Sequence, residues 1–407
     1  MTRWRVKSIH EKRYGCPYCS SKNVIRRGIR KGKEKYYCKD CCHWFQINRS
    51  KTKIFDTKKV LNLHLSGLSF RNLGEVLELN ASTVYRKIKP LLNELPHCAD
   101  LSRGNDKHYC GILLIDGKYV HIKGYKDKIP CIYGIDYLTH DIVHFVVSRG
   151  ENYQTSLSFF QSIKLLGYPL KALVCDDNQN FQLACRRTYP KAVIQICHNH
   201  YKENIRRNLM VRSDSTYRPF IYEIEKLFSK RRSIDEFFFI AKKILIKYGS
   251  DPKCQSVLLD IERRKNVLLA HVLEKHIPRT TNLIECFNSH LECRLKSIKG
   301  FESIHHARLW FNAYFIRRRL KPFTDCTGQF KKLNGRCSLQ IAIQDNSKFQ
   351  ALKKKFKWPF LQRCPTWAEG TGVEPACHCW RLFSKQVPYH SEHPSFTKVS
   401  EGMPSFI

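Results

Sequence analysis

The sequence predicts a multidomain protein in which a small metal-bound module and a short helical unit precede a larger α/β core. Three observations lead to this prediction. Two CxxC pairs lie in a basic N-terminal stretch, an apolar pattern of helical period follows them, and from about residue 108 the pattern changes to strands that later alternate with helices. A chain of 407 residues is also long enough for about two to four domains.

The composition indicates a polyanionic partner. Lys and Arg number 72 against 35 Asp and Glu, which gives a formal net charge of +37. With 42% hydrophobic residues the chain can bury a core, which excludes a wholly disordered basic protein. Since no stretch approaches the roughly 18 apolar residues of a membrane span, and the start lacks the apolar segment of a secretion signal, we expect a cytoplasmic, nucleoid-associated protein without membrane partners. In that compartment the 19 cysteines should remain thiols or bind metal.

The segment 1–53 is predicted to be a zinc ribbon. Two CxxC pairs flank a segment with hairpin-like alternation, and four thiolates at this spacing can complete a tetrahedral Zn²⁺ shell. The predicted ligands are Cys16, Cys19, Cys38 and Cys41, with Cys42 as an alternative to Cys41. Because a module this short has too little apolar surface to fold by burial alone, we expect metal binding to supply its folding free energy. A four-cysteine shell leaves no open position, and we therefore expect a structural zinc.

The segment 54–100 is predicted to be a DNA-binding helix-turn-helix. Apolar residues recur at helical spacing in three short runs, which Gly67 and the stretch around Asn80 separate. We expect Ser82 to cap the last helix and Val84, Ile88 and Leu91 to face the interior. The residues left for a major groove are Thr83, Tyr85, Arg86 and Lys87. A plain three-helix packing unit is the alternative, but the neighbouring basic ribbon favours DNA binding.

The segments 108–204 and 279–325 are predicted to form one catalytic core that a helical insertion, 205–278, interrupts. Three β-rich runs are followed by helix, strand, helix and strand, an order that fits the ribonuclease H-like fold. The runs are 111–124, 130–140, 141–150, 152–167, 171–177, 178–190 and 192–200. From 326 to 407 the regularity fades, and we expect an irregular C-terminal tail.

Acidic residues in apolar surroundings indicate a metal-dependent catalytic site. Asp116 lies within an apolar strand and Asp176 directly follows another, and in this topology the two strands run side by side at the centre of the sheet. Their carboxylates would repel each other unless a divalent cation neutralised them. Glu285, on a later helix whose packed face we expect to be Leu283, Phe287, Leu291 and Leu295, is the best third carboxylate. The alternatives left open are Asp177 in place of Asp176, and Asp136 or Glu292 as the partner of Asp116.

The motifs IDGKYV, VCDD, CHNH and TTNLIECFNS together resemble those of DDE transposases of the mutator-like group, over roughly residues 108–320. The resemblance implies that Asp116, Asp176 and Glu285 are the catalytic triad. It also matches Cys197 and His200 to a Cys-x-x-His motif of that family, with possible catalytic support, although packing residues are an equal alternative. Asp177 departs from the family, which commonly has Gly at this position.

The sequence therefore predicts a transposase that binds the terminal inverted repeats of a mobile element and cleaves and rejoins DNA with Mg²⁺ or Mn²⁺. Arginines should add salt-dependent phosphate contacts. The candidates are Arg206, Arg207, Arg317, Arg318 and Arg319. The expected partners are double-stranded DNA, both element ends and target, and further copies of the chain. The alternatives are a DNA-binding regulator with an inactive core and a structure-selective nuclease of the same fold.

Overall fold

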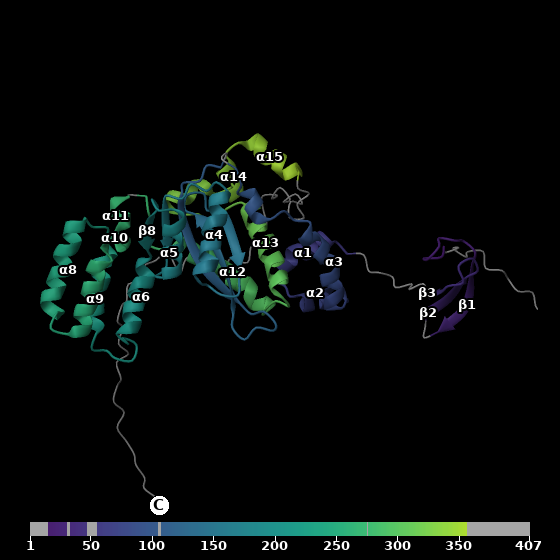
Figure 1. Cartoon of the computed structure of the whole chain (residues 1–407), viewed down its shortest axis with the longest axis horizontal. Helices are drawn as coiled ribbons and strands as arrows, with labels where there is room; N and C mark the ends of the chain where they lie inside the picture. The colour runs from purple at the N-terminus through teal and green to yellow at the C-terminus, as the bar shows by residue number, and fades with distance from the viewer. Residues whose placement is uncertain (1–14, 31–32, 47–54, 105–106, 275, 356–407) are drawn as a thin grey trace, which may run out of the picture. The chain divides into compact units, whose positions relative to one another are not determined.

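The computed structural model describes residues 15–30, 33–46, 55–104, 107–274 and 276–355. The chain divides into two compact units, Met1–Asp56 and Thr57–Ile407. Figure 1 labels many of their elements. None of the helices in the described ranges is long and apolar enough to cross a membrane.

The first unit contains a three-stranded antiparallel sheet in the order β1-β2-β3. Its strands are β1 (Val24–Arg30), β2 (Lys33–Cys38) and β3 (Trp44–Gln46). Its buried core is very small and consists of Cys16, Tyr36, Cys38 and Phe45. So little apolar burial cannot offset the conformational entropy of ordering the chain, as expected for a module that a metal holds together.

The second unit begins with a three-helix unit whose interior is apolar. The helices are α1 (Thr57–Leu65), α2 (Phe70–Leu77) and α3 (Ala81–Asn93). The turn between α2 and α3 is tight, because a Cβ on Gly74 would lie 2.5 Å from the carbonyl oxygen of Leu79. The expectation that Ser82 caps α3 is wrong: the residue before the helix is Asn80, and Ser82 lies inside the first turn. The interior residue at the end of α3 is Leu92 and not Leu91, because Leu92 continues the i, i+4 spacing of the buried Val84 and Ile88.

A five-stranded mixed sheet forms the centre of the second unit (Figure 1), with the strand order β6-β5-β4-β7-β8. The strands are β4 (Ile112–Val120), β5 (Ile129–Asp136), β6 (Ile142–Val147), β7 (Ala172–Cys175) and β8 (Val193–Ile196). The first three strands pair antiparallel, whereas β4 and β7, and β7 and β8, pair parallel. The predicted adjacency of the strands that carry Asp116 and precede Asp176 is thus confirmed.

Helices cover both faces of this sheet. On one face, α4 (Tyr153–Leu165) and α5 (Gln179–Thr188) bury a large apolar cluster against the strands. On the other, α12 (Asn282–Ile298) contacts β4 and α13 (Ile304–Leu320) contacts β6. The packed residues of α12 are Ile284, Phe287 and Leu291, so the expected stripe through Leu283 and Leu295 is wrong: these two are only half-buried. Phe287 and Leu291 pack as expected, and Ile284 takes the place of Leu283.

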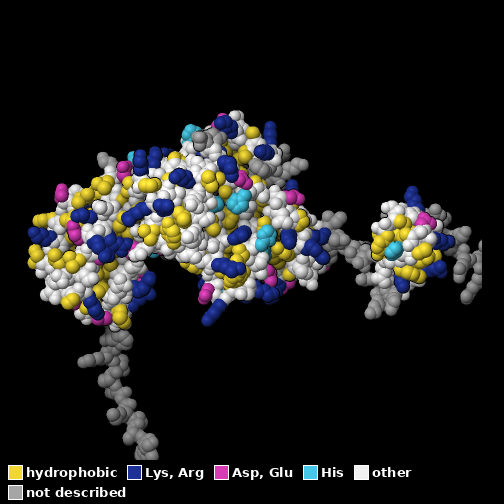
Figure 2. Space-filling view, in the orientation of Figure 1, with side chains coloured by type: hydrophobic (Ala, Val, Ile, Leu, Met, Phe, Trp, Pro, Cys, Tyr) yellow, Lys and Arg dark blue, Asp and Glu magenta, His cyan; other side chains and the backbone are white. Residues whose placement is uncertain are grey.

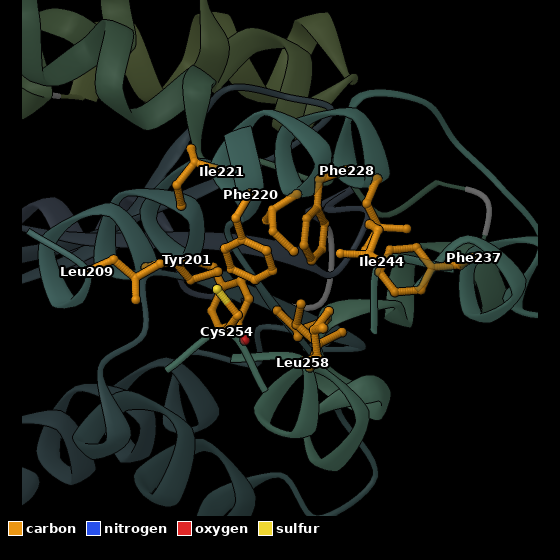
Figure 3. Packing of buried hydrophobic residues seen from close by; sticks show 14 of the residues in the cluster. Tyr201, Leu209, Phe220, Ile221, Phe228, Phe237, Ile244, Cys254 and Leu258 are labelled. Carbon is orange, nitrogen blue, oxygen red and sulfur yellow. The ribbon is translucent and has the colours of Figure 1, made fainter. Parts of the chain in front are cut away.

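The interruption between β8 and α12 is helical from residue 198, seven residues before the predicted start of the insertion, and has an apolar core of its own (Figure 3). Its helices are α6 (His198–Asn208), α7 (Arg218–Ser229), α8 (Ile234–Tyr248), α9 (Pro252–Arg263), α10 (Lys265–Leu268) and α11 (Ala270–Leu273). Aromatic rings such as Phe220, Phe228 and Phe237 meet at its centre. The short helices α10 and α11 contact β8, which joins the insertion to the edge of the sheet.

The expectation of an irregular segment from residue 326 is wrong for the part that the structure describes. A 3₁₀ turn, Gly328–Leu333, is followed by α14 (Ser338–Ile343) and α15 (Asn346–Lys355). These elements are short, but they bury Leu333, Ile341 and Phe349. Their few apolar residues gave too short a pattern for a sequence-based prediction. The remainder of the predicted tail, 356–407, lies outside the described residues.

A fully buried ion pair joins several elements of the second unit. Arg319 donates to Asp141 through Nε at 2.9 Å and Nη2 at 2.6 Å, and both side chains are 0% exposed. Arg319 also donates to the backbone carbonyl of Cys98, while Ser338 and Tyr109 donate to Asp141. The pair therefore ties α13 to the start of β6, to the linker after α3 and to α14. Arg319 cannot contact DNA phosphates, and its predicted role in DNA binding is wrong.

Replacing Arg319 by Met should destabilise the protein by about 3–5 kcal/mol, because the Asp141 carboxylate would remain buried without its cation. Urea unfolding followed by fluorescence measures this loss. Arg187→Met, the same substitution at an exposed position of α5, serves as the control and should change stability by no more than about 0.5 kcal/mol. A loss below about 1 kcal/mol in Arg319→Met would contradict the structural role of this pair.

Candidate active site

Asp116 lies near the middle of β4, just beyond the last residues that pair with β7. Its Oδ1 accepts a hydrogen bond from the backbone N–H of Gly117 at 2.8 Å, and its Oδ2 accepts one from Nδ2 of Asn288 at 2.5 Å. Burial raises the pKa of Asp116 to about 6, and the negative charges of Asp176 and Glu285 add to the shift. The protein therefore holds this carboxyl where its ionised form is disfavoured, which is typical of a functional site.

Asp176 follows the last residue of β7, and its carboxylate is poorly satisfied. Its Oδ1 is buried and has no hydrogen-bond partner among the described residues. Burial raises the pKa of Asp176, while the nearby His200 acts in the opposite direction. A buried acceptor without a partner is costly unless something else, such as a cation, satisfies it.

Glu285 lies in the first turn of α12, beside a buried threonine. Its Oε1 accepts a hydrogen bond from Oγ1 of Thr281 at 2.7 Å and lies 3.8 Å from Nε2 of His200. The helix thus brings to the sheet a carboxylate that is 109 positions from Asp176 in the sequence. On the next turn of the same helix, Asn288 contacts Asp116 and accepts a hydrogen bond from the Tyr133 hydroxyl.

The charges of Asp176 and Glu285 both act on Asp116, but the three carboxylates do not form one compact ligand set. Among the described residues, two groups have three or more potential ligand atoms within 4.8 Å of one another, and neither contains Asp116 or Asp176. One group is Cys197, His200 and Glu285, and the other is the set of four ribbon cysteines. Glu285 therefore shares a group of potential metal ligands with the Cys-x-x-His motif, while its charge also acts on Asp116.

Cys197 and His200 interact directly at the start of α6. Burial acts to raise the pKa of Cys197, but hydrogen bonds from His200 and Thr281 outweigh it and lower that pKa. The interaction with Cys197 raises the pKa of His200 to about 9. Thr281 donates to Cys197 through its backbone N–H at 3.3 Å, and its hydroxyl, whose single proton Cys197 and Glu285 share, lies 3.1 Å from the sulfur. An imidazolium is thereby held beside the three carboxylates, where it offsets part of their charge.

The alternative residues of the sequence analysis make other contacts. Asp177 forms a bidentate ion pair with Arg264, Asp136 accepts hydrogen bonds from Tyr168 and Thr139, and Glu292 pairs with Lys118. His198, which adjoins the Cys-x-x-His motif, is buried against the insertion, where its Nε2 lies 2.7 Å from the carbonyl of Leu268.

Asp177 and Arg264 connect the turn after β7 to the end of α9. Their side chains are 18% and 22% exposed, so solvent screens the pair only in part. In a double-mutant cycle of Asp177→Ala and Arg264→Ala, we expect a coupling energy of about 1–3 kcal/mol from urea unfolding. Glu262 and Lys265 form an exposed pair at i,i+3, and the same cycle on them should give about 0.5 kcal/mol or less. Additive effects at Asp177 and Arg264 would show that the pair does not fasten the insertion to the core.

Three residues near the site were not assigned a role from the sequence. Asn288 follows Glu285 by three positions in the same helix, and this spacing, which places both side chains on one helical face, was the available signal. Thr281 precedes α12 in the motif TTNLIE, where a capping residue is expected, but its contact with Cys197 depends on the fold. Glu151 lies in the loop before α4 and shows no sequence signal, yet its carboxylate is close enough to both Asp116 and Asp176 for their charges to raise its pKa, after the larger effect of burial.

The four ribbon cysteines form a group with the dimensions of a zinc site. The Sγ atoms of Cys16 and Cys41 lie 3.5 Å apart, and those of Cys19 and Cys38 lie 3.6 Å apart. Tetrahedral Zn²⁺ with Zn–S bonds of about 2.3 Å places its sulfurs roughly 3.8 Å apart, so the group fits this ion. Cys42 is not part of it; Cys42 is exposed and has a left-handed φ of 58°.

The predicted groove-contacting residues of α3 do not all share one environment. Arg86 is exposed, and Thr83 and Lys87 are half-buried. Tyr85 packs against Phe70 and against His306 of α13, with ring centroids 5.3 and 4.9 Å apart, so its ring takes part in the contact between the three-helix unit and the core.

Comparisons with known proteins define the class of this protein. The model of the family described as "Transposase, Mutator family" matches residues 46–307. The chain therefore belongs to the Mutator family of transposases, a class of proteins that act in DNA recombination. A comparison with curated proteins finds no relative of this chain.

Two solved retroviral structures show partial likeness. The catalytic core domain of HTLV-2 integrase, in complex with magnesium, is 19% identical with a TM-score of 0.18, over 35% of this chain and 86% of that chain. The intasome of simian T-cell lymphotropic virus, in complex with the PP2A regulatory subunit B56 gamma, gives 14% identity and a TM-score of 0.20, over 68% of this chain and 76% of that chain. Both TM-scores are low, so the description of the fold rests on its own strand order and directions.

Proposed function

We propose that this Mutator-family transposase cleaves and rejoins phosphodiester bonds at a site formed by Asp116, Asp176 and Glu285. The observation that carries the proposal is the position of Asp116 within β4 and of Asp176 directly after the parallel neighbour β7, with α12 bringing Glu285 close enough to raise the pKa of Asp116. The strand order, with three antiparallel strands followed by two parallel ones, supports a ribonuclease H-like core.

The donor set fits a hard divalent cation. Carboxylate oxygens are the preferred ligands of Mg²⁺ and Mn²⁺, and the unpaired buried Oδ1 of Asp176 and the raised pKa of Asp116 both indicate a place where positive charge would be stabilising. Asp116, Asp176 and Glu285 would hold the metal, which activates the attacking hydroxyl or water and stabilises the leaving oxygen when bound. In sites with two metal ions, the ions lie about 3.5–4 Å apart, so carboxylates that bind different ions need not belong to one coordination shell.

The chain's own residues would prepare this site for reaction. Asn288 holds the Asp116 carboxylate through its amide, and the Tyr133 hydroxyl fixes the orientation of that amide. Thr281 holds Glu285 in the same way. The charged His200 lies beside Glu285 and is well placed to donate a hydrogen bond to a phosphate oxygen of the DNA.

We further propose that residues 1–100 recognise the ends of the element. The zinc ribbon and α3 supply the recognition surface, with Thr83, Arg86 and Lys87 on α3 as the candidates for groove contacts. Tyr85 would instead support α3 from behind, because its ring packs against α13. Lys and Arg side chains, spread over the visible face in Figure 2, would add phosphate contacts that weaken as salt increases.

Most of the arginines predicted to contact phosphate serve other contacts. Arg317 donates to Leu65 and Ser66, Arg318 lies over the ring of Phe287, and Arg206 pairs with Glu225. Of the five, Arg207 is the exposed one, and it remains a candidate. Because two DNA ends must be processed together, we expect the active form to be a homo-oligomer on double-stranded DNA, in the cytoplasm at the nucleoid.

The function is tested with duplex DNA that carries the inverted repeats bordering the gene. We expect Mg²⁺- or Mn²⁺-dependent nicking at the repeat end and tighter binding to this duplex than to a scrambled one at equal salt. Binding with sequence preference but without cleavage would favour a regulator with an inactive core. Cleavage of branched DNA without repeat preference would favour a structure-selective nuclease. Either result would overturn the proposal.

A further inference from the structure

Glu151 connects β4, which carries Asp116, to the turn after β7, which carries Asp176. It lies in the short loop between β6 and α4, and no part of the proposed reaction assigns it a role. Its Oε2 accepts a hydrogen bond from the hydroxyl of Tyr119, three residues after Asp116, at 3.0 Å. Its Oε1 accepts one from Nδ2 of Asn178, two residues after Asp176.

The loop makes a third contact with the turn after β7. The backbone carbonyl of Glu151 accepts a hydrogen bond from Nδ2 of Asn180 at 3.3 Å. Asn178 is itself fixed, because its Oδ1 accepts a hydrogen bond from the backbone N–H of Asn180 and thereby caps α5. Its amide group therefore cannot rotate without losing the cap, and its Nδ2 remains directed at Glu151.

The residue after Asp116 leaves room for this carboxylate. A Cβ on Gly117 would overlap Oε2 of Glu151, so any larger residue there would displace the end of the Glu151 side chain. The carboxylate of Glu151 thus packs on the backbone of β4 immediately after Asp116. Successive residues of a strand point to opposite faces, so Glu151 approaches from the α4/α5 side, opposite to Asp116.

The negative charge of Glu151 carries an electrostatic cost, because it lies near two other carboxylates. Glu151 lies close enough to Asp116 and Asp176 for like-charge repulsion, and it is partly buried. Hydrogen bonds from Tyr119 and Asn178 offset only part of that cost. A neutral side chain that spans the same distance would make a similar bridge at lower electrostatic cost.

We propose that Glu151 is a positioning residue that sets the separation of Asp116 and Asp176, and with it the affinity of the site for divalent cations. This inference rests on the proposed function. Residues that orient metal ligands through hydrogen bonds typically change metal affinity or activity by about 10- to 100-fold when they are removed.

Mn²⁺ affinity of the zinc-loaded full-length protein, measured by electron paramagnetic resonance of free Mn²⁺, tests the proposal without depending on catalysis. Glu151→Ala should weaken Mn²⁺ binding by about tenfold or more. Glu151→Gln should lose distinctly less, because its amide oxygen accepts from Asn178 while its Nε2 donates to the Tyr119 hydroxyl. Equal losses in the two variants would overturn the positioning role, since only the charge would then matter.

A swapped pair gives the sharper test. Asn178→Asp keeps the cap on α5 but places a carboxylate opposite Glu151, so the bridge breaks and Mn²⁺ binding should weaken by about tenfold. A purely electrostatic effect would strengthen it instead, and that outcome overturns the proposal. In the double variant Asn178→Asp, Glu151→Gln, the hydrogen bond between the two positions is restored, with position 151 as the donor and position 178 as the acceptor. Its Mn²⁺ affinity should return to within about threefold of that of Glu151→Gln alone. Failure to recover, with the double variant as weak as Asn178→Asp, also overturns it.

Two further variants separate this inference from the proposed function. Asn208→Asp, at an exposed position of α6, adds the same charge elsewhere and should leave Mn²⁺ affinity unchanged. Asp116→Asn should weaken Mn²⁺ binding strongly. If it does not, the proposed metal site itself fails; if it does while Glu151→Ala binds normally, only the role of Glu151 fails.

Discussion

Asp116→Asn is expected to reduce divalent-metal-dependent DNA cleavage by about three orders of magnitude or more, and Asp176→Asn should do the same. Loss of a carboxylate that holds a catalytic cation removes several kcal/mol of transition-state stabilisation, and about 4 kcal/mol corresponds to a factor of roughly 10³. Single-turnover cleavage of the repeat-end duplex, with Mg²⁺ and with Mn²⁺, measures the effect.

The same variant should not be less stable than the natural protein. Burial and neighbouring negative charge raise the pKa of Asp116 to about 6, above its unfolded value. A carboxyl with a raised folded-state pKa stabilises the fold at low pH and costs stability once the pH rises through about 6, so removing its charge at pH 7.5 should leave the melting temperature equal or higher. Loss of cleavage together with a lower melting temperature would point to misfolding instead.

Asp127→Asn provides the matched control for these variants. Asp127 is exposed in the loop between β4 and β5, so the same chemical change removes one negative charge without touching the site. Its cleavage rate should lie within about twofold of the natural protein. Metal-dependent cleavage that persists in both Asp116→Asn and Asp176→Asn would be incompatible with the proposed catalytic site.

Removal of zinc should unfold the N-terminal ribbon and leave the second unit folded. Apparent binding free energies of structural zinc sites are about 10–16 kcal/mol near neutral pH, which far exceeds what the small apolar core of this module can supply. A strong chelator, or Cys38→Ser, should therefore expose residues 15–46 to rapid proteolysis and weaken binding to the repeat-end duplex. Atomic emission analysis of the purified protein should find one zinc per chain.

Cys42→Ser is the control for the ribbon, because Cys42 adjoins a predicted ligand but lies outside the cysteine group. It should retain one zinc and normal resistance to protease. If Cys42→Ser loses the metal while Cys41→Ser keeps it, the assignment of the fourth ligand is wrong. If the untreated protein contains no zinc, the ribbon assignment as a whole is refuted.

The sequence was most informative where a feature depends on residues close together in the chain, such as metal-ligand spacing or apolar alternation. The spacing of the CxxC pairs was sufficient to predict the four cysteines that lie together, and the alternation of apolar residues predicted all five strands of the central sheet. It was least informative at short elements. The helices α14 and α15 bury only a few residues each. The start of α3 was predicted too late, because Ser82 is of a residue type that commonly caps helices.

The sequence by itself determined the class of fold and the basic character, and it predicted the acidic residues of the candidate site, because local periodicity and strand order depend mainly on neighbours in the chain. Only the tertiary structure decided which polar side chains meet. It paired Asp177 with Arg264 and Arg319 with Asp141, and it brought Asn288 to Asp116. Such contacts join residues that are 87 to 178 positions apart, and their partners are selected by the packing of helices on the sheet, which no local pattern records.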